Sequence, residues 1–152
     1  MSFKTLTLED QNIFRAAEQK SPLVLSDTIF TNLFIWRSYY RPTWAEAHGC
    51  ICIVANPEGE EAFGLPPVGG GDQLAALDYT LEHLKSKTDH PLFKRVPEHL
   101  AQKIEEADRP YLCEHDRDND DYIYPRSQLC GLSGRKMHQK KNHYNYFINH
   151  YN

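Results

Sequence analysis

The stretch that decides the fold is residues 43–74, TWAEAHGCICIVANPEGEEAFGLPPVGGGDQL. It holds three β-prone runs, Thr43–His48, Cys50–Asn56 and Glu61–Val68, with turn residues at His48-Gly49 and at 56–59 between them. Three consecutive strands joined by short turns predict an antiparallel meander. The central run alternates through CICIV, so Cys50 and Cys52 should lie on one face of a strand as buried, reduced thiols.

Downstream of the meander, three glycines lead into a periodic helix, DQLAALDYTLEHLKSK, residues 72–87. Leucines at the helical spacing mark its buried stripe: Leu74, Leu77, Leu81 and Leu84. LFKRV, residues 92–96, predicts a short strand, and PEHLAQKIEEAD, residues 97–108, a further helix. The order strand, loop, helix, strand predicts a right-handed crossover to a parallel neighbour. The expected fold class is therefore α/β (α+β), a mixed sheet with helices on both faces.

The N-terminal part should add one strand and two helices to this sheet. Residues 3–7 alternate and predict a strand, and Thr7 with Asp10 can cap a helix that runs to about Lys20. The residues that this helix should bury are Leu8, Ile13, Phe14 and Ala17. Ser26 or Asp27 can cap a second helix, residues 28–40, whose all-round apolar character predicts a central position in the core. We expect Pro22 and Pro42 to end these two segments.

The C-terminal part should contain two strands and a helix. YLCEH, residues 111–115, and DYIYP, residues 121–125, are typical of strands around the polar sequence DRDND. Residues 135–151 predict a final helix with cations in its first two turns. Its apolar side should carry Met137, Tyr144, Phe147, Ile148 and Tyr151.

Length and composition describe one ordinary globular domain spanning residues 1–152, with a formal charge of −4. That charge argues against a protein that coats nucleic acid with its whole surface, although a local basic patch can still bind phosphate. No run approaches the roughly 18 apolar residues of a membrane span. Because MSFKTLTLEDQ also lacks the layout of a signal peptide, we expect a cytoplasmic protein without a transmembrane segment.

The first candidate site is LPPVGGGDQL, residues 65–74. Glycines before a helix can present backbone N–H groups to a phosphate, and the candidate donor-binding residues are Val68, Gly69, Gly70 and Gly71. No Walker lysine follows, and Asp72 would itself occupy the free N–H groups as an N-cap. The alternative is a plain strand-to-helix turn.

The second candidate site is EHDRDNDDYIY, residues 114–124. Its aspartates have the spacing of a calcium loop, but Asp121 replaces the loop glycine and Ser127 the bidentate glutamate. Asp116 and Arg117 could instead order the loop. A buried carboxylate could also act as a general base, which makes Asp116 and Asp118 weak catalytic candidates.

The third candidate site is the cationic start of the final helix. Its candidate phosphate-binding residues are Arg135, Lys136, Lys140 and Lys141. Cations there oppose the helix dipole, and such a departure from a local rule is a hint of function. The alternative is a solvated basic face. We predict no metal site, because the histidines lack the spacing of a zinc helix and the four cysteines form no CxxC pairs.

Four motifs, SDTIFTNLFIWRSYY, LPPVGGGD, DRDNDDYIY and LSGRKMHQKKNHYNYF, occur in this order along the chain. Together they resemble the bacterial family that shares the phosphatidylglycerol lysyltransferase C-terminal domain. The resemblance implies a GNAT-like acyltransferase fold with a twisted sheet, often found as a tandem of two such domains, of which this chain looks like the N-terminal half. It also implies an acyl or aminoacyl donor, acyl-coenzyme A or aminoacyl-tRNA, beside Val68–Gly71.

Two functions follow from the resemblance. The first is an acyltransferase or aminoacyltransferase, although PPVGGGDQL departs from the coenzyme A signature of GNAT enzymes. The alternative is a non-catalytic module whose basic helix binds RNA such as tRNA, an anionic phospholipid or a partner domain. A second GNAT-like domain or a homodimer is the expected protein partner.

Overall fold

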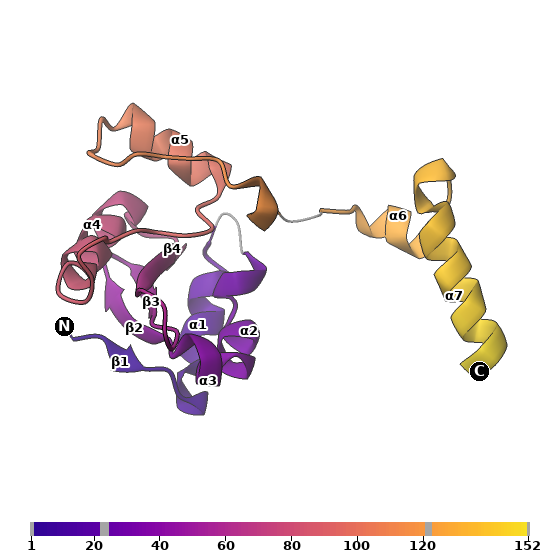
Figure 1. The fold of residues 1–152 in the computed structure, drawn as a ribbon, viewed down its shortest axis with the longest axis horizontal. Coiled ribbons are helices and arrows are strands. Elements are labelled where there is room, and N and C mark those ends of the chain that lie inside the picture. Colours follow the sequence, from indigo (N-terminus) through magenta and orange to yellow (C-terminus); the bar gives the residue numbers. More distant parts are fainter. Residues whose placement is uncertain (1, 22–24, 121–122, 152) are drawn as a thin grey trace. The chain divides into compact units, whose positions relative to one another are not determined.

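The computed structural model describes residues 2–21, 25–120 and 123–151 (Figure 1). Its internal contacts divide the chain into two compact units, Met1–Cys113 and Glu114–Asn152. The first unit holds the sheet, and the second unit is built of helices and turns.

The sheet of the first unit has four strands in the order β1-β2-β3-β4. Their bounds are β1 Lys4–Thr5, β2 Thr43–Ala47, β3 Cys50–Ala55 and β4 Phe63–Gly69. Every neighbouring pair is antiparallel, and Thr43 lies opposite Val54 while Ala47 lies opposite Cys50. The predicted meander is therefore confirmed.

Helices cover both faces of the sheet, as the sequence predicted. The alternation of β3 divides its side chains, because Ile51 and Ile53 join the cluster with α1 (Gln11–Glu18) and α2 (Phe30–Ile35), whereas Cys52 packs against α4 (Gln73–Leu84). Figure 1 shows α4 on the opposite side of the sheet from α1 and α2. All six residues of β3 are buried, which explains the almost wholly apolar run.

The predicted strand at residues 92–96 is reduced to one parallel bridge between Gly64 and Phe93. The Gly64 N–H donates to the Leu92 carbonyl at 2.9 Å, and the Lys94 N–H donates to the Gly64 carbonyl at 3.0 Å. Arg95 then takes a positive φ of 61°, which ends the extended conformation. The next helix, α5 (Glu98–Glu106), packs Leu100 and Ile104 against Leu77 of α4.

The first N-terminal helix is shorter than predicted and partly misassigned in its buried residues. A 3-10 turn, η1 (Leu8–Asp10), precedes α1, which ends at Glu18. Phe14 is buried as predicted, but Leu8 is 59% exposed and Ile13 38%. Pro22, the predicted helix stop, lies outside the described residues.

The predicted second helix is interrupted. It consists of a 3-10 turn, η2 (Ser26–Thr28), then α2 and α3 (Arg37–Tyr40). Trp36 lies between α2 and α3 with ψ of 12°, outside helical geometry, and is 54% exposed. The prediction that one continuous helix lies centrally in the core is therefore wrong, although Phe30 and Leu33 are buried.

The second unit consists of η3 (Arg117–Asn119), α6 (Arg126–Gly131), η4 (Arg135–Met137) and α7 (His138–Tyr151). The final helix is confirmed, with a 3-10 first turn. The prediction of a strand at 111–115 is wrong, because these residues form no strand. The prediction of a strand at 121–125 is also wrong for residues 123–125, the part that the structure describes. Helix α6 was not predicted. Within residues 2–21, 25–120 and 123–151, no helix is both long and apolar enough to cross a bilayer.

Candidate functional site

The glycine loop after β4 lies against the turn between β2 and β3. A Cβ on Gly71 would sit 2.0 Å from the His48 carbonyl oxygen, and one on Gly69 would sit 2.8 Å from the Gly49 carbonyl oxygen. Gly69 also has a positive φ of 145°, which favours glycine. The close approach of two backbones therefore explains these glycines without a ligand. The Val68 side chain is buried in the core on the α1 side.

The N-terminus of α4 is capped from within the chain. The Asp72 carboxylate accepts a hydrogen bond from the Ala75 N–H at 3.0 Å, and the Asp72 N–H donates to the His48 carbonyl at 2.9 Å. A carboxylate at this position satisfies the helix end and disfavours a second anion. Gly70 and Gly71 are nevertheless exposed, so a neutral group can still reach their backbone.

The thiols beside this loop are not nucleophiles. Burial raises the pKa of Cys50, with a partial offset from the Gly71 N–H, and burial raises the pKa of Cys52 to about 11. Both cysteines are therefore protonated at neutral pH and act as small apolar side chains, as the sequence predicted.

The aspartates of the second candidate site order their own loop. The Asp116 carboxylate accepts hydrogen bonds from the Asp118 N–H at 3.2 Å and from the Asn119 amide at 2.6 Å. His115 Nε2 lies 3.1 Å from an Asp120 oxygen. Asp116 and Asp118 are exposed, so the burial that would favour a general base is missing within the second unit. No group of three or more His, Cys, Asp or Glu in the described part of the chain could hold a metal ion.

The basic segment, residues 135–141, brings the four predicted cations together over η4 and the first turn of α7. All four are exposed, and the ion pairs found among the described residues involve none of them. The Lys140 ammonium lies 4.9 Å from the centre of the Tyr124 ring. Met137, within the same segment, is buried.

The charge of the chain is divided along its length. All 21 acidic residues lie at or before Asp121, together with 12 of the 17 Lys and Arg. The first 121 residues therefore carry a formal charge of −9 and the last 31 carry +5. The second unit, Glu114–Asn152, contains five acids and six Lys or Arg, a formal charge of +1, but all five acids lie at or before Asp121. Its positive charge is therefore concentrated in the part that holds the basic segment.

Exposed aromatic rings continue along α7 beyond the basic segment. Tyr146 stacks on His150 with centroids 4.0 Å apart, and Phe147 stacks on Tyr151 at 5.6 Å. The exposed rings are Tyr144, Tyr146, Phe147 and Tyr151. Tyr146 was not predicted as a functional residue, because it lies away from the predicted apolar side of the helix. Its i, i+4 spacing from His150 is the signal in the sequence that could have indicated it.

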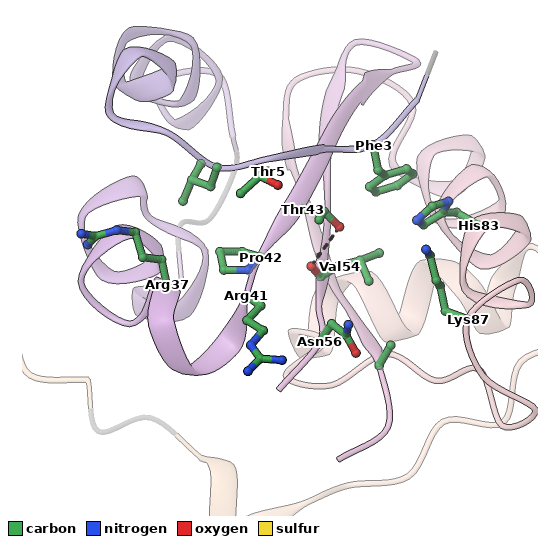
Figure 2. A pocket seen from close by; sticks show the side chains of 12 residues that line it. Phe3, Thr5, Arg37, Arg41, Pro42, Thr43, Val54, Asn56, His83 and Lys87 are labelled. Atoms are coloured by element: carbon green, nitrogen blue, oxygen red, sulfur yellow. Dashed lines mark hydrogen bonds between the residues drawn. The ribbon is translucent and has the colours of Figure 1, made fainter. Parts of the chain in front are cut away.

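A cavity of about 450 Å³ opens in the first unit, at the end of the sheet opposite the glycine loop. Its lining includes Phe3, Arg41, Thr43, Val54, His83 and Lys87 (Figure 2). No sequence motif indicated this cavity, because its residues come from separate segments of the chain.

A family model described as phosphatidylglycerol lysyltransferase, C-terminal, matches residues 20–152. The chain belongs to this family. No curated protein matches it. The matched residues include both the glycine loop and the basic segment, and the resemblance inferred from the four motifs is confirmed.

A solved structure, a conserved protein of unknown function from Bacteroides thetaiotaomicron VPI-5482, is similar to this member of the phosphatidylglycerol lysyltransferase C-terminal family. The TM-score is 0.78 and the sequence identity 29% over 98% of this chain. The chain spans about half the length of that protein, since the match covers 50% of it. The likeness supports the α+β fold, with its antiparallel sheet and covering helices.

Proposed function

We propose that this chain is an aminoacyl-transferase-type domain whose basic segment binds the acceptor end of a charged tRNA. In the reaction, the ester between the aminoacyl carbon and the tRNA ribose oxygen breaks, and a new ester forms to an acceptor hydroxyl. The proton of that hydroxyl ends on the ribose oxygen. The family description names lysyl transfer to phosphatidylglycerol, which is the model for this chemistry.

The observation that carries the proposal is the grouping of Arg135, Lys136, Lys140 and Lys141 in a unit that has no acid after residue 121. These exposed cations can neutralise phosphates at little cost, because among the described residues they give up no ion pair. The exposed rings of α7 add surfaces on which the unpaired bases of a tRNA end can stack.

The glycine loop would serve the donor in a second way. Asp72 at its edge disfavours a phosphate, so the exposed backbone of Gly70 and Gly71 suits the neutral carbonyl oxygen of the aminoacyl ester better. The order β4, loop, α4 and a parallel bridge at Gly64 supports the GNAT-like arrangement that places a donor beside Val68–Gly71. Acyl-coenzyme A carries phosphates and fits this loop less well for the same reason.

A second candidate function is a binding module without turnover. The exposure of Asp116 and Asp118 favours it, because these first candidates for a general base form an ordered loop within their unit. Such a module would bind tRNA through the same basic segment and would present it to a partner domain.

The experiment measures binding and turnover on one preparation. Lysyl-tRNA binding is followed by fluorescence anisotropy, and transfer of labelled lysine to phosphatidylglycerol vesicles is followed by extraction; acyl-coenzyme A is the competing donor. Binding with transfer supports the enzyme, and binding without transfer supports the module.

A matched pair of variants assigns the binding. In one variant, glutamine replaces all four cations of the basic segment. In the other, glutamine replaces four exposed cations of the first unit, Arg15, Lys20, Lys85 and Lys103. Both lose four charges, so a non-specific charge effect would weaken both equally. We expect only the first to lose tRNA binding; equal binding by the first variant and the unaltered chain would refute the proposal.

A further inference from the structure

The cavity of the first unit lies on the α4 face of the sheet, beyond the end of that helix. Thr5, Thr43 and Val54 are cross-strand neighbours in register, so their side chains share one face of the sheet. Val54 packs with Leu84, the last residue of α4. Because α4 ends at Leu84, it does not cover the sheet face beyond that residue, and the cavity of about 450 Å³ opens there, within the size range of small-molecule sites.

One wall of the cavity is a flat aromatic surface. The Phe3 ring stacks on the His83 imidazole with centroids 4.0 Å apart and planes 11° apart. Burial first, and then the Lys87 charge, lower the pKa of His83, so the ring is neutral at neutral pH. This wall therefore offers apolar area with a hydrogen-bonding edge and no charge of its own.

The charged side chains that line the cavity are all positive. Among the described residues that line it there is no Asp or Glu, whereas Arg37, Arg41 and Lys87 take part. Because acids outnumber bases in the chain as a whole, 21 to 17, a lining without acids departs from its composition. The cavity therefore repels cations and suits an anion.

Two of the three cations are placed to receive an anion. The Arg37 guanidinium is already engaged, since it donates to the Phe34 carbonyl at 2.6 Å and lies 4.0 Å from the Phe34 ring centre. Figure 2 shows Arg41 and Lys87 on opposite sides of the cavity, with Thr43 and Val54 between them.

Arg41 has a partner that a ligand could displace. Its guanidinium pairs with the Glu58 carboxylate, and the Glu58 side chain is 80% exposed. An exposed pair of this kind contributes little to stability, so a bound anion can compete with it. Glu58 does not line the cavity and can move away into solvent.

We propose that this cavity binds a small organic anion, with its carboxylate or phosphate group between Arg41 and Lys87 and its apolar body against Phe3. The Asn56 amide, in the lining, donates a hydrogen bond to the head group, and the Thr43 hydroxyl does so by giving up its long 3.5 Å bond to the Val54 carbonyl. The site belongs wholly to the first unit and uses none of the basic segment, so it is independent of tRNA binding.

The test is a titration of the full ¹⁵N-labelled chain, followed by amide chemical shifts. The probes share one ring and differ in charge: phenyl phosphate, phenylacetate and neutral benzyl alcohol. We expect saturable shifts at Thr5, Thr43, Val54 and Asn56 with one or both anions, and the tighter anion identifies the head group. Benzyl alcohol should bind at least about 5-fold more weakly, the loss expected when a charge-assisted contact is missing.

Variants assign the binding to the two cations. Lys87→Gln and Arg41→Gln should each weaken binding of the tighter anion by about 3- to 5-fold. Glu58→Gln should strengthen binding of that anion by about 2-fold, because a competing carboxylate is removed. Lys85→Gln, which removes a nearby charge paired with Glu82 outside the lining, is the control and should bind unchanged. Equal binding of benzyl alcohol, equal weakening by the control, or no shift with either anion would overturn the proposal.

Discussion

Replacing Gly71 by alanine tests the inference that the glycine loop is shaped by the β2–β3 turn rather than by a ligand. The new Cβ would sit 2.0 Å from the His48 oxygen and 2.7 Å from two backbone carbons of Gly49. Since contacts under 3.0 Å are not tolerated, the turn or the loop must move. Such overpacking costs about 1–3 kcal/mol. Movement also weakens the bond from the Asp72 N–H to His48, worth about 0.5–1.5 kcal/mol.

The expected loss for Gly71→Ala is therefore about 2–4 kcal/mol of unfolding free energy, or about 8–16 °C in Tm for a unit of this size. Gly70→Ala is the matched control, because its Cβ would meet the Lys20 carbonyl oxygen at 3.1 Å, a contact that a small shift relieves. It should change stability by less than about 1 kcal/mol. Urea unfolding in the absence of any ligand, monitored by tryptophan fluorescence, measures the unfolding free energy of both variants. Equal stability of the two variants would refute the steric account of the loop.

Two further predictions concern buried groups of the first unit. The Asp10 carboxylate accepts hydrogen bonds from Lys4, Thr7 and the Trp44 indole; burial alone would raise its pKa, but these bonds together lower it. Asp10→Asn should therefore cost about 1–3 kcal/mol at neutral pH. The unaltered chain should lose that stability as pH falls below about 4 through the lowered pKa, and urea midpoints of the variant should depend less on acid. Thiol titration with Ellman's reagent should label exposed Cys130 rapidly and Cys52 only after unfolding, and prompt labelling of Cys52 would contradict its burial.

The sheet was predictable because its signals are local and agree with one another. Alternation in CICIV, turn residues at His48-Gly49 and the leucine stripe of α4 each specify a face or a bend. The break in the second helix was not predictable, because the apolar residues all round 28–40 fit one continuous helix. In the structure Phe30 and Leu33 are buried, whereas Ile35 and Trp36 are exposed. At residues 111–115, aromatic and apolar residues suggested a strand, but 86%-exposed Leu112 shows that no sheet partner covers it.

The candidate sites also divide into those that the sequence could predict and those that it could not. The basic segment was visible in the sequence because its cations are neighbours on one helix. The close packing of Gly71 on His48 was not, since it depends on two loops that meet only in the folded sheet. The cavity beside Phe3 and Lys87 was also invisible, because it joins a chain end to the turn after α4.

The salt dependence of tRNA binding tests the central claim most directly. If Arg135, Lys136, Lys140 and Lys141 each neutralise one phosphate, replacing all four with glutamine should reduce the slope of log K against log salt by about 3. The variant that lacks Arg15, Lys20, Lys85 and Lys103 should keep the slope of the unaltered chain. An unchanged slope in the first variant, or an equal reduction in both, would contradict the assignment of phosphate binding to the basic segment.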